Sequence, residues 1–220
     1  MQPIPTFSRL AGVATLAVCV VALLGAGPAV QASGPIWLIW EAENYTKIEP
    51  LMTTSDRPPR PDKERPAGAA IFVPPNDKND NHRKGLVVYR IRVPTDGKYV
   101  LWGRKYWMHG CGNSMFISVD TKKNVLGEDG NYERWQWWQV QTGDPDSPNK
   151  QTAVFDLKKG EHIIIVANRE DGARLDQLCL TTDQRVVPGG GYKALKPTPG
   201  VVVDGVLDKK AAETREAKAQ

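Results

Sequence analysis

Runs of basic residues are missing from this chain. The formal net charge is only +4 over 220 residues, and the lysine pairs that begin at Lys122, Lys158 and Lys209 stand far apart in the sequence. A nucleic-acid-binding surface needs clustered positive charge that follows a phosphate backbone. The sequence therefore gives no support for nucleic acid as a partner.

Familiar catalytic motifs are missing as well. The sequence contains no Ser-His-Asp order, nucleophile elbow, phosphate-binding loop or paired metal motif. A zinc site built on His109 and Cys111 lacks a second pair of ligands, because His82 and His162 are remote in the sequence. These absences argue against an enzyme.

Long apolar segments are scarce, and the one clear apolar run spans residues 10–24. Arg9 precedes this run, and Ala29-Val30-Gln31-Ala32 follows it with small residues suited to cleavage after Ala32. This is typical of a secretory signal peptide over residues 1–32. The run is short for a membrane span, and no other segment approaches the roughly 20 apolar residues that a span needs. We expect a protein without an integral membrane span that is secreted, periplasmic or held in the cell envelope. A lipoprotein anchored at Cys19 is an alternative, although Val18 is bulkier than the residue usual before a lipidated cysteine.

Cysteine is also rare, with three residues in the chain. Removal of the leader takes away Cys19 and leaves Cys111 and Cys179, an even number in an oxidising compartment. A disulfide between them would close a loop of about 68 residues and contribute about 4 kcal/mol in the chain-entropy model. Two buried free thiols are the alternative.

Helical periodicity is nearly absent, and most strong signals are of the strand type. Residues 86–93 alternate from Tyr89 onward and stop at Pro94, and Asp96-Gly97 then forms a turn into the next apolar segment. Nine strands of this kind predict an all-β sandwich. They are residues 36–42, 69–73, 86–93, 99–102, 114–119, 135–140, 152–157, 162–167 and 175–180.

The sequence outside the strands divides the chain. Residues 52–67 and 76–84 are long polar or proline-rich loops. A glycine run at 189–191 and two prolines at 197 and 199 follow the last strand. We therefore expect a sandwich domain over residues 33–186 and a flexible linker and tail over residues 187–220.

Two glutamates at the beginning of the domain are the most informative polar residues. Glu41 and Glu43 share one face of a strand, with Cα atoms roughly 7 Å apart by the strand rise. Such close like charges are costly unless a cation, a proton or a basic side chain lies between them. A hard divalent ion with Asp176 as a third oxygen donor meets this requirement. Solvated glutamates and a catalytic carboxylate pair are the alternatives.

The order of motifs resembles the carbohydrate-binding modules of families six and thirty-five, which share a galactose-binding-like jelly-roll β-sandwich. The resemblance covers about residues 37–183 and lies in Glu41-Ala42-Glu43, residues 90–94, 97–104, 113–120, 135–137, 157–162 and 169–176. It implies a jelly roll of about nine strands with a structural calcium where the first and last strands meet. Glu41, Glu43 and Asp176 occupy the matching carboxylate positions, and backbone carbonyls complete the shell.

The resemblance also implies sugar binding by loops at one end of the sandwich. Trp107 stands in a loop-like stretch where an exposed indole can stack on a sugar ring, and Asn113 or Arg104 can bond the hydroxyl groups. Packing of Trp107 over the loop is the alternative. We therefore expect a secreted, non-catalytic protein that binds a polysaccharide or glycan and carries a structural calcium. An envelope or matrix scaffold without a sugar ligand is the alternative function.

Overall fold

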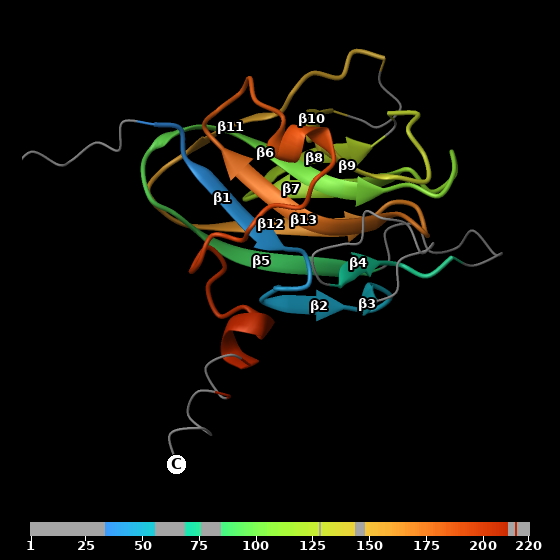
Figure 1. Ribbon diagram of the computed structural model, residues 1–220, viewed down its shortest axis with the longest axis horizontal. Coiled ribbons are helices and arrows are strands. Elements are labelled where there is room, and N and C mark those ends of the chain that lie inside the picture. The colour runs from blue at the N-terminus through green and yellow to red at the C-terminus, as the bar shows by residue number, and fades with distance from the viewer. Residues whose placement is uncertain are drawn as a thin grey trace, which may run out of the picture. The chain divides into compact units, whose positions relative to one another are not determined.

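Thirteen β-strands in two antiparallel sheets make up nearly half of the described chain (Figure 1). The computed structural model describes residues 34–55, 69–75, 85–127, 129–143, 148–210 and 214. The expected leader, residues 1–32, and most of the two long polar loops lie outside these ranges. The predicted all-β sandwich is confirmed.

One sheet has seven strands and the other has six. The seven are β1 (Trp37–Glu41), β3 (Thr53–Ser55), β4 (Ala70–Phe72), β6 (Gly97–Tyr106), β9 (Trp135–Gln139), β11 (Val154–Leu157) and β13 (Arg174–Thr181). They run in the order β11-β6-β13-β4-β3, with β1 paired to β13 and β9 paired to β6.

The six-stranded sheet runs in the order β10-β8-β7-β12-β5-β2. Its strands are β2 (Lys47–Glu49), β5 (Leu86–Val93), β7 (Ser114–Val119), β8 (Lys122–Gly127), β10 (Gln141–Thr142) and β12 (Gly160–Asn168). Four of the thirteen strands (β2, β3, β8 and β10) were not predicted, because their sequences are short or polar and lack the alternating pattern.

The core lies between the two sheets and contains side chains from both of them. In β5, Tyr89 and Ile91 are fully buried because alternate residues of a strand face the same side. Leu101 of β6 and Leu178 of β13 meet them from the seven-stranded sheet. Trp40 of β1 packs edge-on against the Tyr89 ring, with ring centroids 5.9 Å apart. The first and last strands are therefore both built into one core.

The C-terminal segment differs from the predicted linker, because residues 188–207 pack on the sandwich. A short 3₁₀ helix, η1 (Pro188–Gly191), leads into a stretch that crosses β13 and β1 and then runs beside β5 and β2 (Figure 1). Val202 pairs with Ile91, and both Val201 and Val202 join the core. The glycine and proline content correctly predicts that this segment lacks regular secondary structure. It does not predict that a few apolar residues dock the segment on the sandwich. We call residues 188–198 the strap.

Among the residues that the structure describes, there is no helix with the length and apolar character needed to cross a membrane.

Candidate cation site and ligand-binding loops

A β-bulge positions the aspartate of the expected cation site. Along β13, Leu175 pairs with Lys105 and Gln177 pairs with Arg104, so Asp176 is an extra residue in the ladder. A bulge of this kind turns a side chain away from the regular alternation. The fully buried Asp176 carboxylate meets the buried guanidinium of Arg104, with Nη1 donating to Oδ2 at 2.6 Å.

Glu41 and Glu43 approach this aspartate from the end of β1. Glu41 pairs with Gln177 in the β1–β13 ladder, and the Ala42 N–H donates to the Asp176 carbonyl at 2.8 Å. Gln177 Nε2 donates to Glu41 Oε1 at 3.0 Å, and the backbone N–H of Ala69 donates to Glu43 Oε1 at 2.7 Å. The three residues predicted from the sequence thus lie near one another where β1 meets β13, close enough for their charges to interact.

Both glutamates have strongly raised pKa values. Burial raises the pKa of Glu41 to about 7, and the negative charges of Glu43 and Asp176 add to this effect against the hydrogen bond from Gln177 and the positive charge of Arg104. Burial likewise raises the pKa of Glu43 to about 7, and the charge of Asp176 contributes. The causes are desolvation and mutual repulsion, which are the two effects that a bound cation relieves.

Each glutamate has one oxygen in a hydrogen bond and a second oxygen that is buried without one. These second oxygens are Glu41 Oε2 and Glu43 Oε2. A buried carboxylate oxygen without a donor is costly, and carboxylate oxygens are the donors that calcium prefers. In charge and donor type the residues therefore fit a hard cation. The carboxylates do not form a closed shell, because within the described ranges no three His, Cys, Asp or Glu side chains are grouped closely enough to hold a metal ion.

A cavity of about 280 Å³ lies beside Glu41. Glu41 and Asn44 line it on the side of β1, and Pro197 and Thr198 of the strap line it on the other. Solvent and small ions can therefore reach a space beside Glu41, one of the two glutamates with an unbonded oxygen. The strap forms part of the wall of this cavity.

The predicted stacking residue, Trp107, is not available to a sugar. Its side chain is fully buried in the main core, and its carbonyl accepts a hydrogen bond from the Glu133 N–H at 2.8 Å. The ammonium of Lys105 lies 5.0 Å from the Trp107 ring centroid. The packing alternative is therefore correct, because Trp107 directly follows β6 and is covered by the loop before β9 rather than standing in an open loop.

Asn113 and Arg104, predicted to bond sugar hydroxyls, are also buried. The Asn113 N–H donates to Glu170 Oε2 at 2.9 Å, which ties two loops together. Arg104 is committed to Asp176 and, through Nε, to the carbonyl of Tyr192 at 2.8 Å. Their assignment as ligand contacts is therefore wrong for this structure, since both residues are buried and the Arg104 guanidinium already bonds Asp176 and the strap.

The predicted disulfide between Cys111 and Cys179 is not formed. Cys111 is exposed in the loop after β6, whereas Cys179 is buried in the middle of β13 opposite Trp102. Burial raises the pKa of the Cys179 thiol to about 12. An even cysteine count in an exported chain does not place two side chains together, and a disulfide needs Cα atoms within about 7 Å.

An exposed aromatic residue that the sequence analysis missed lies at the same end as Trp107. Tyr132 is 37% exposed, and its hydroxyl lies beside Gly110 of the loop after β6. The loop that carries Tyr132 is braced from below by Lys105, whose buried ammonium contacts Asp129 at 2.6 Å and donates to the Asn131 carbonyl at 2.9 Å. The turn-forming sequence that leads to it, Asp129-Gly130-Asn131-Tyr132, is the signal that could have identified it.

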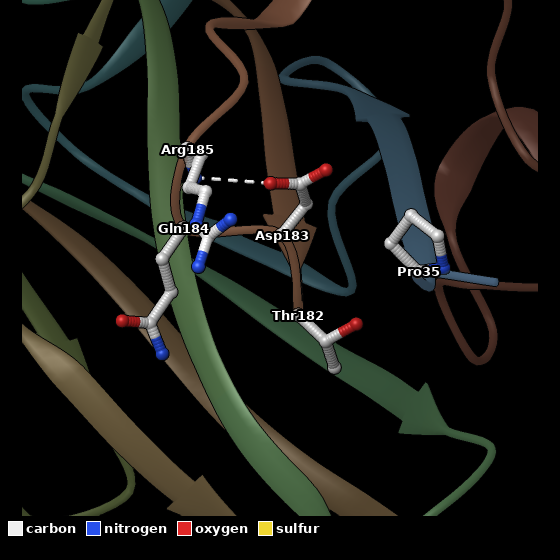
Figure 2. A pocket seen from close by; sticks show the side chains of 5 residues that line it. All are labelled: Pro35, Thr182, Asp183, Gln184 and Arg185. Atoms are coloured by element: carbon white, nitrogen blue, oxygen red, sulfur yellow. Dashed lines mark hydrogen bonds between the residues drawn. The ribbon is translucent and has the colours of Figure 1, made fainter.

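A separate hollow of about 530 Å³ at the end of β13 lacks the features of a sugar site. Its lining consists of Pro35, Thr182, Asp183, Gln184 and Arg185, none of which is aromatic. Figure 2 shows Pro35 and Gln184 on opposite sides of it, and Asp183 turned to the backbone of Arg185, whose N–H donates to Oδ1 at 2.9 Å. The lining side chains therefore offer no stacking platform.

Comparison of structures finds similar sandwiches, although no protein-family model and no curated protein matches this sequence. The C-terminal family-six module of the laminarinase LamC from Zobellia galactanivorans is 13% identical, with 66% of this chain and 99% of that chain covered and a TM-score of 0.45. A family 35 carbohydrate-binding module from Clostridium thermocellum is 18% identical, with 67% and 98% covered and a TM-score of 0.43. A module of lichenase 5A from Cellvibrio mixtus, solved with cellotriose, is 12% identical, with 66% and 97% covered and a TM-score of 0.43.

The resemblance predicted from the motifs is thus also found between structures. Because these identities lie below 20% and the TM-scores below 0.5, the similarity identifies neither a ligand nor a binding residue in this chain. The sandwich itself is established by the strand pairing of this chain, and the sites are argued from its own side chains.

Proposed function

We propose that this protein is a secreted, non-catalytic carbohydrate-binding protein with a structural calcium site where β1 and β13 meet. One observation carries the calcium site: Glu41 and Glu43 each hold one buried oxygen without a hydrogen-bond donor, next to the buried Asp176. Glu41 and Glu43 would supply these oxygens, and backbone carbonyls would add to the shell. Asp176 contributes negative charge while Arg104 holds its Oδ2.

Calcium in this position would have a structural effect and no catalytic one. When bound, it neutralises the repulsion among three carboxylates and fixes the end of β1 to β13. Glycoside hydrolysis requires two carboxyl groups that flank the scissile bond from opposite sides. Glu41 and Glu43 instead project from the same strand end. The geometry therefore favours the structural site over the catalytic pair.

For the sugar ligand, the aromatic platform that we propose is Tyr132. An exposed ring on a braced loop offers a flat apolar face at small cost in conformational entropy, and its hydroxyl can bond a sugar. The neighbouring His109 and Cys111 are exposed on the loop after β6 and border the same surface. This replaces the buried Trp107, Asn113 and Arg104 as the ligand-contacting set.

Binding to a glycan array and to insoluble polysaccharides tests the sugar proposal. Saturable binding that Tyr132→Ala reduces at least tenfold supports it. Tyr192→Ala is a matched control, because Tyr192 is also exposed, at 45%, but lies on the strap. Absence of binding to any glycan by the calcium-loaded protein favours the alternative function, an envelope or matrix scaffold, and release of reducing sugar would contradict the non-catalytic proposal.

A further inference from the structure

The strap is held to the seven-stranded sheet mainly through its backbone. Arg104 Nε donates to the Tyr192 carbonyl and Trp137 Nε1 donates to the Lys193 carbonyl, both at 2.8 Å. Gln177 bonds the strap twice, since Nε2 donates to the Leu195 carbonyl at 2.8 Å and Oε1 accepts from the Leu195 N–H at 2.9 Å. Side chains of the sheet thus bind the backbone groups of the strap.

Two of these side chains also hold the carboxylates of the proposed calcium site. Arg104 bonds Asp176 through Nη1 and the strap through Nε. Gln177 Nε2 bonds both Glu41 Oε1, at 3.0 Å, and the Leu195 carbonyl. The carboxylate cluster and the strap are therefore linked by two single-residue bridges, with no further residue between them.

Beneath the strap lies an apolar face of the sheet that faces away from the main core. It is formed by Ile39, Val100, Trp102, Trp137 and Cys179, and we call it the outer patch. Leu195 of the strap packs on it, and the Cys179 side chain is fully buried. A patch with two tryptophans is a surface that a soluble domain ordinarily keeps covered, and here the strap lies against it.

We propose that a cation bound by Glu41 and Glu43, next to Asp176, locks the strap over the outer patch, through Arg104 and Gln177. This proposal rests on the calcium site proposed above and adds that the bound cation controls whether the strap covers the outer patch. With a cation present, the carboxylates are held together and their other oxygens keep Arg104 and Gln177 in the positions that bind the strap. Without it, the carboxylates repel one another and separate, and the two bridges move with them.

The thiol of Cys179 reports on this cover directly. In protein carrying Cys19→Ser and Cys111→Ser, Cys179 is the sole cysteine whether or not the leader has been removed. We expect its reaction with a thiol reagent to be at least tenfold faster in chelator than in excess calcium. Equal rates in the two conditions, in protein that binds calcium, overturn the coupling.

A second buried thiol separates local opening from global unfolding. Val166→Cys, made in protein with all three native cysteines replaced by serine, places a thiol in the main core, where Val166 is fully buried. If calcium acts only on overall stability, both thiols change their rates by the same factor. The coupling requires a larger change at Cys179 than at residue 166, and an equal change contradicts it.

A matched pair of strap variants tests the bridge without altering the cluster. Leu195→Pro removes the N–H that donates to Gln177 Oε1, whereas Leu195→Ala removes only side-chain atoms. We expect Leu195→Pro to leave Cys179 fast-reacting with or without calcium, and Leu195→Ala to retain the calcium dependence. Direct calcium titration is run alongside: no binding by native protein defeats the proposed calcium site itself, whereas binding without Cys179 protection defeats only the cover.

Discussion

Arg104 and Asp176 form a buried ion pair, 2.6 Å from Nη1 to Oδ2, at a bulge inside the seven-stranded sheet. The Arg104 side chain is 2% exposed and the Asp176 side chain is fully buried. The bulge exists because β13 carries one residue more than β6 between Leu175 and Gln177. Asp176 is this extra residue, and its carboxylate faces Arg104 inside the sheet. Because Arg104 also bonds the Tyr192 carbonyl, the ion pair connects the proposed calcium site to the strap.

Loss of the Arg104 guanidinium should be severely destabilising. Arg104→Met leaves Asp176 buried without its cationic partner, and breaking a buried pair in this way costs about 3–5 kcal/mol. Lys98→Met is the control, because Lys98 pairs with Asp156 at the surface at 3.5 Å, where an ion pair contributes at most about 1 kcal/mol. Urea unfolding of both variants measures the difference. Similar losses in the two would show that the buried pair has no special role.

In metal-free protein, stability should fall as the pH rises from about 4.5 to 7. The pKa values of Glu41 and Glu43 are about 7 in the fold, against 4.5 for an ordinary glutamate. Groups with a raised pKa bind protons more tightly in the folded state, so their contribution is complete below pH 4.5 and is lost through pH 7. Thermal melting in chelator across this range measures the trend. Calcium affinity should rise over the same range, because protons compete for the same oxygens.

Trp107 and Tyr132 should separate stability from binding. Trp107→Ala removes a fully buried ring from the core and should cost about 3–5 kcal/mol. Tyr132→Ala removes an exposed ring and should change the free energy of unfolding by less than about 0.5 kcal/mol. Loss of glycan binding in folded Tyr132→Ala protein, measured with denaturation curves for both variants, supports the assignment. The opposite pattern would restore Trp107 as the platform.

The two cysteines of the described domain should behave as free thiols of very different reactivity. Cys111 is exposed, and burial raises the pKa of the Cys179 thiol to about 12. Reaction of native protein with a thiol reagent should therefore show one fast and one slow group, and unfolding should make both fast. Mass spectrometry under non-reducing conditions checks the same point, since a mass two hydrogens lighter would show the disulfide that the structure lacks.

The sequence predicted those parts of the molecule in which local pattern and burial agree. The alternation in β5 places Tyr89 and Ile91 in the core because one face of that strand is buried and the other is more open. The spacing of Glu41 and Glu43 and their meeting with Asp176 also follow from strand geometry and the family resemblance. These features depend on short-range periodicity, which a single sequence contains.

Other features depend on long-range contacts and were missed. Along β6 every residue from Tyr99 to Tyr106 is buried, because β9, β11 and β13 pair with its edges and the strap lies on the face that a sandwich ordinarily leaves open. This double burial places Arg104 inside the protein, and the loop before β9 encloses Trp107. Residues 188–207 read as a linker because their Gly and Pro content hides the few apolar residues that dock them. A local sequence pattern does not show which distant segment will pack on a strand.

Calcium titration of metal-free protein at pH 7.5 tests the central claim most directly, with Glu43→Gln and Glu49→Gln measured beside the native chain. Glu49 is a glutamate of β2 that pairs with Lys47 at the surface. We predict one calcium per chain, a clear rise in melting temperature, and an affinity at least tenfold weaker in Glu43→Gln but unchanged in Glu49→Gln. Native protein that takes up no calcium and melts at the same temperature in chelator and in excess calcium would contradict the account.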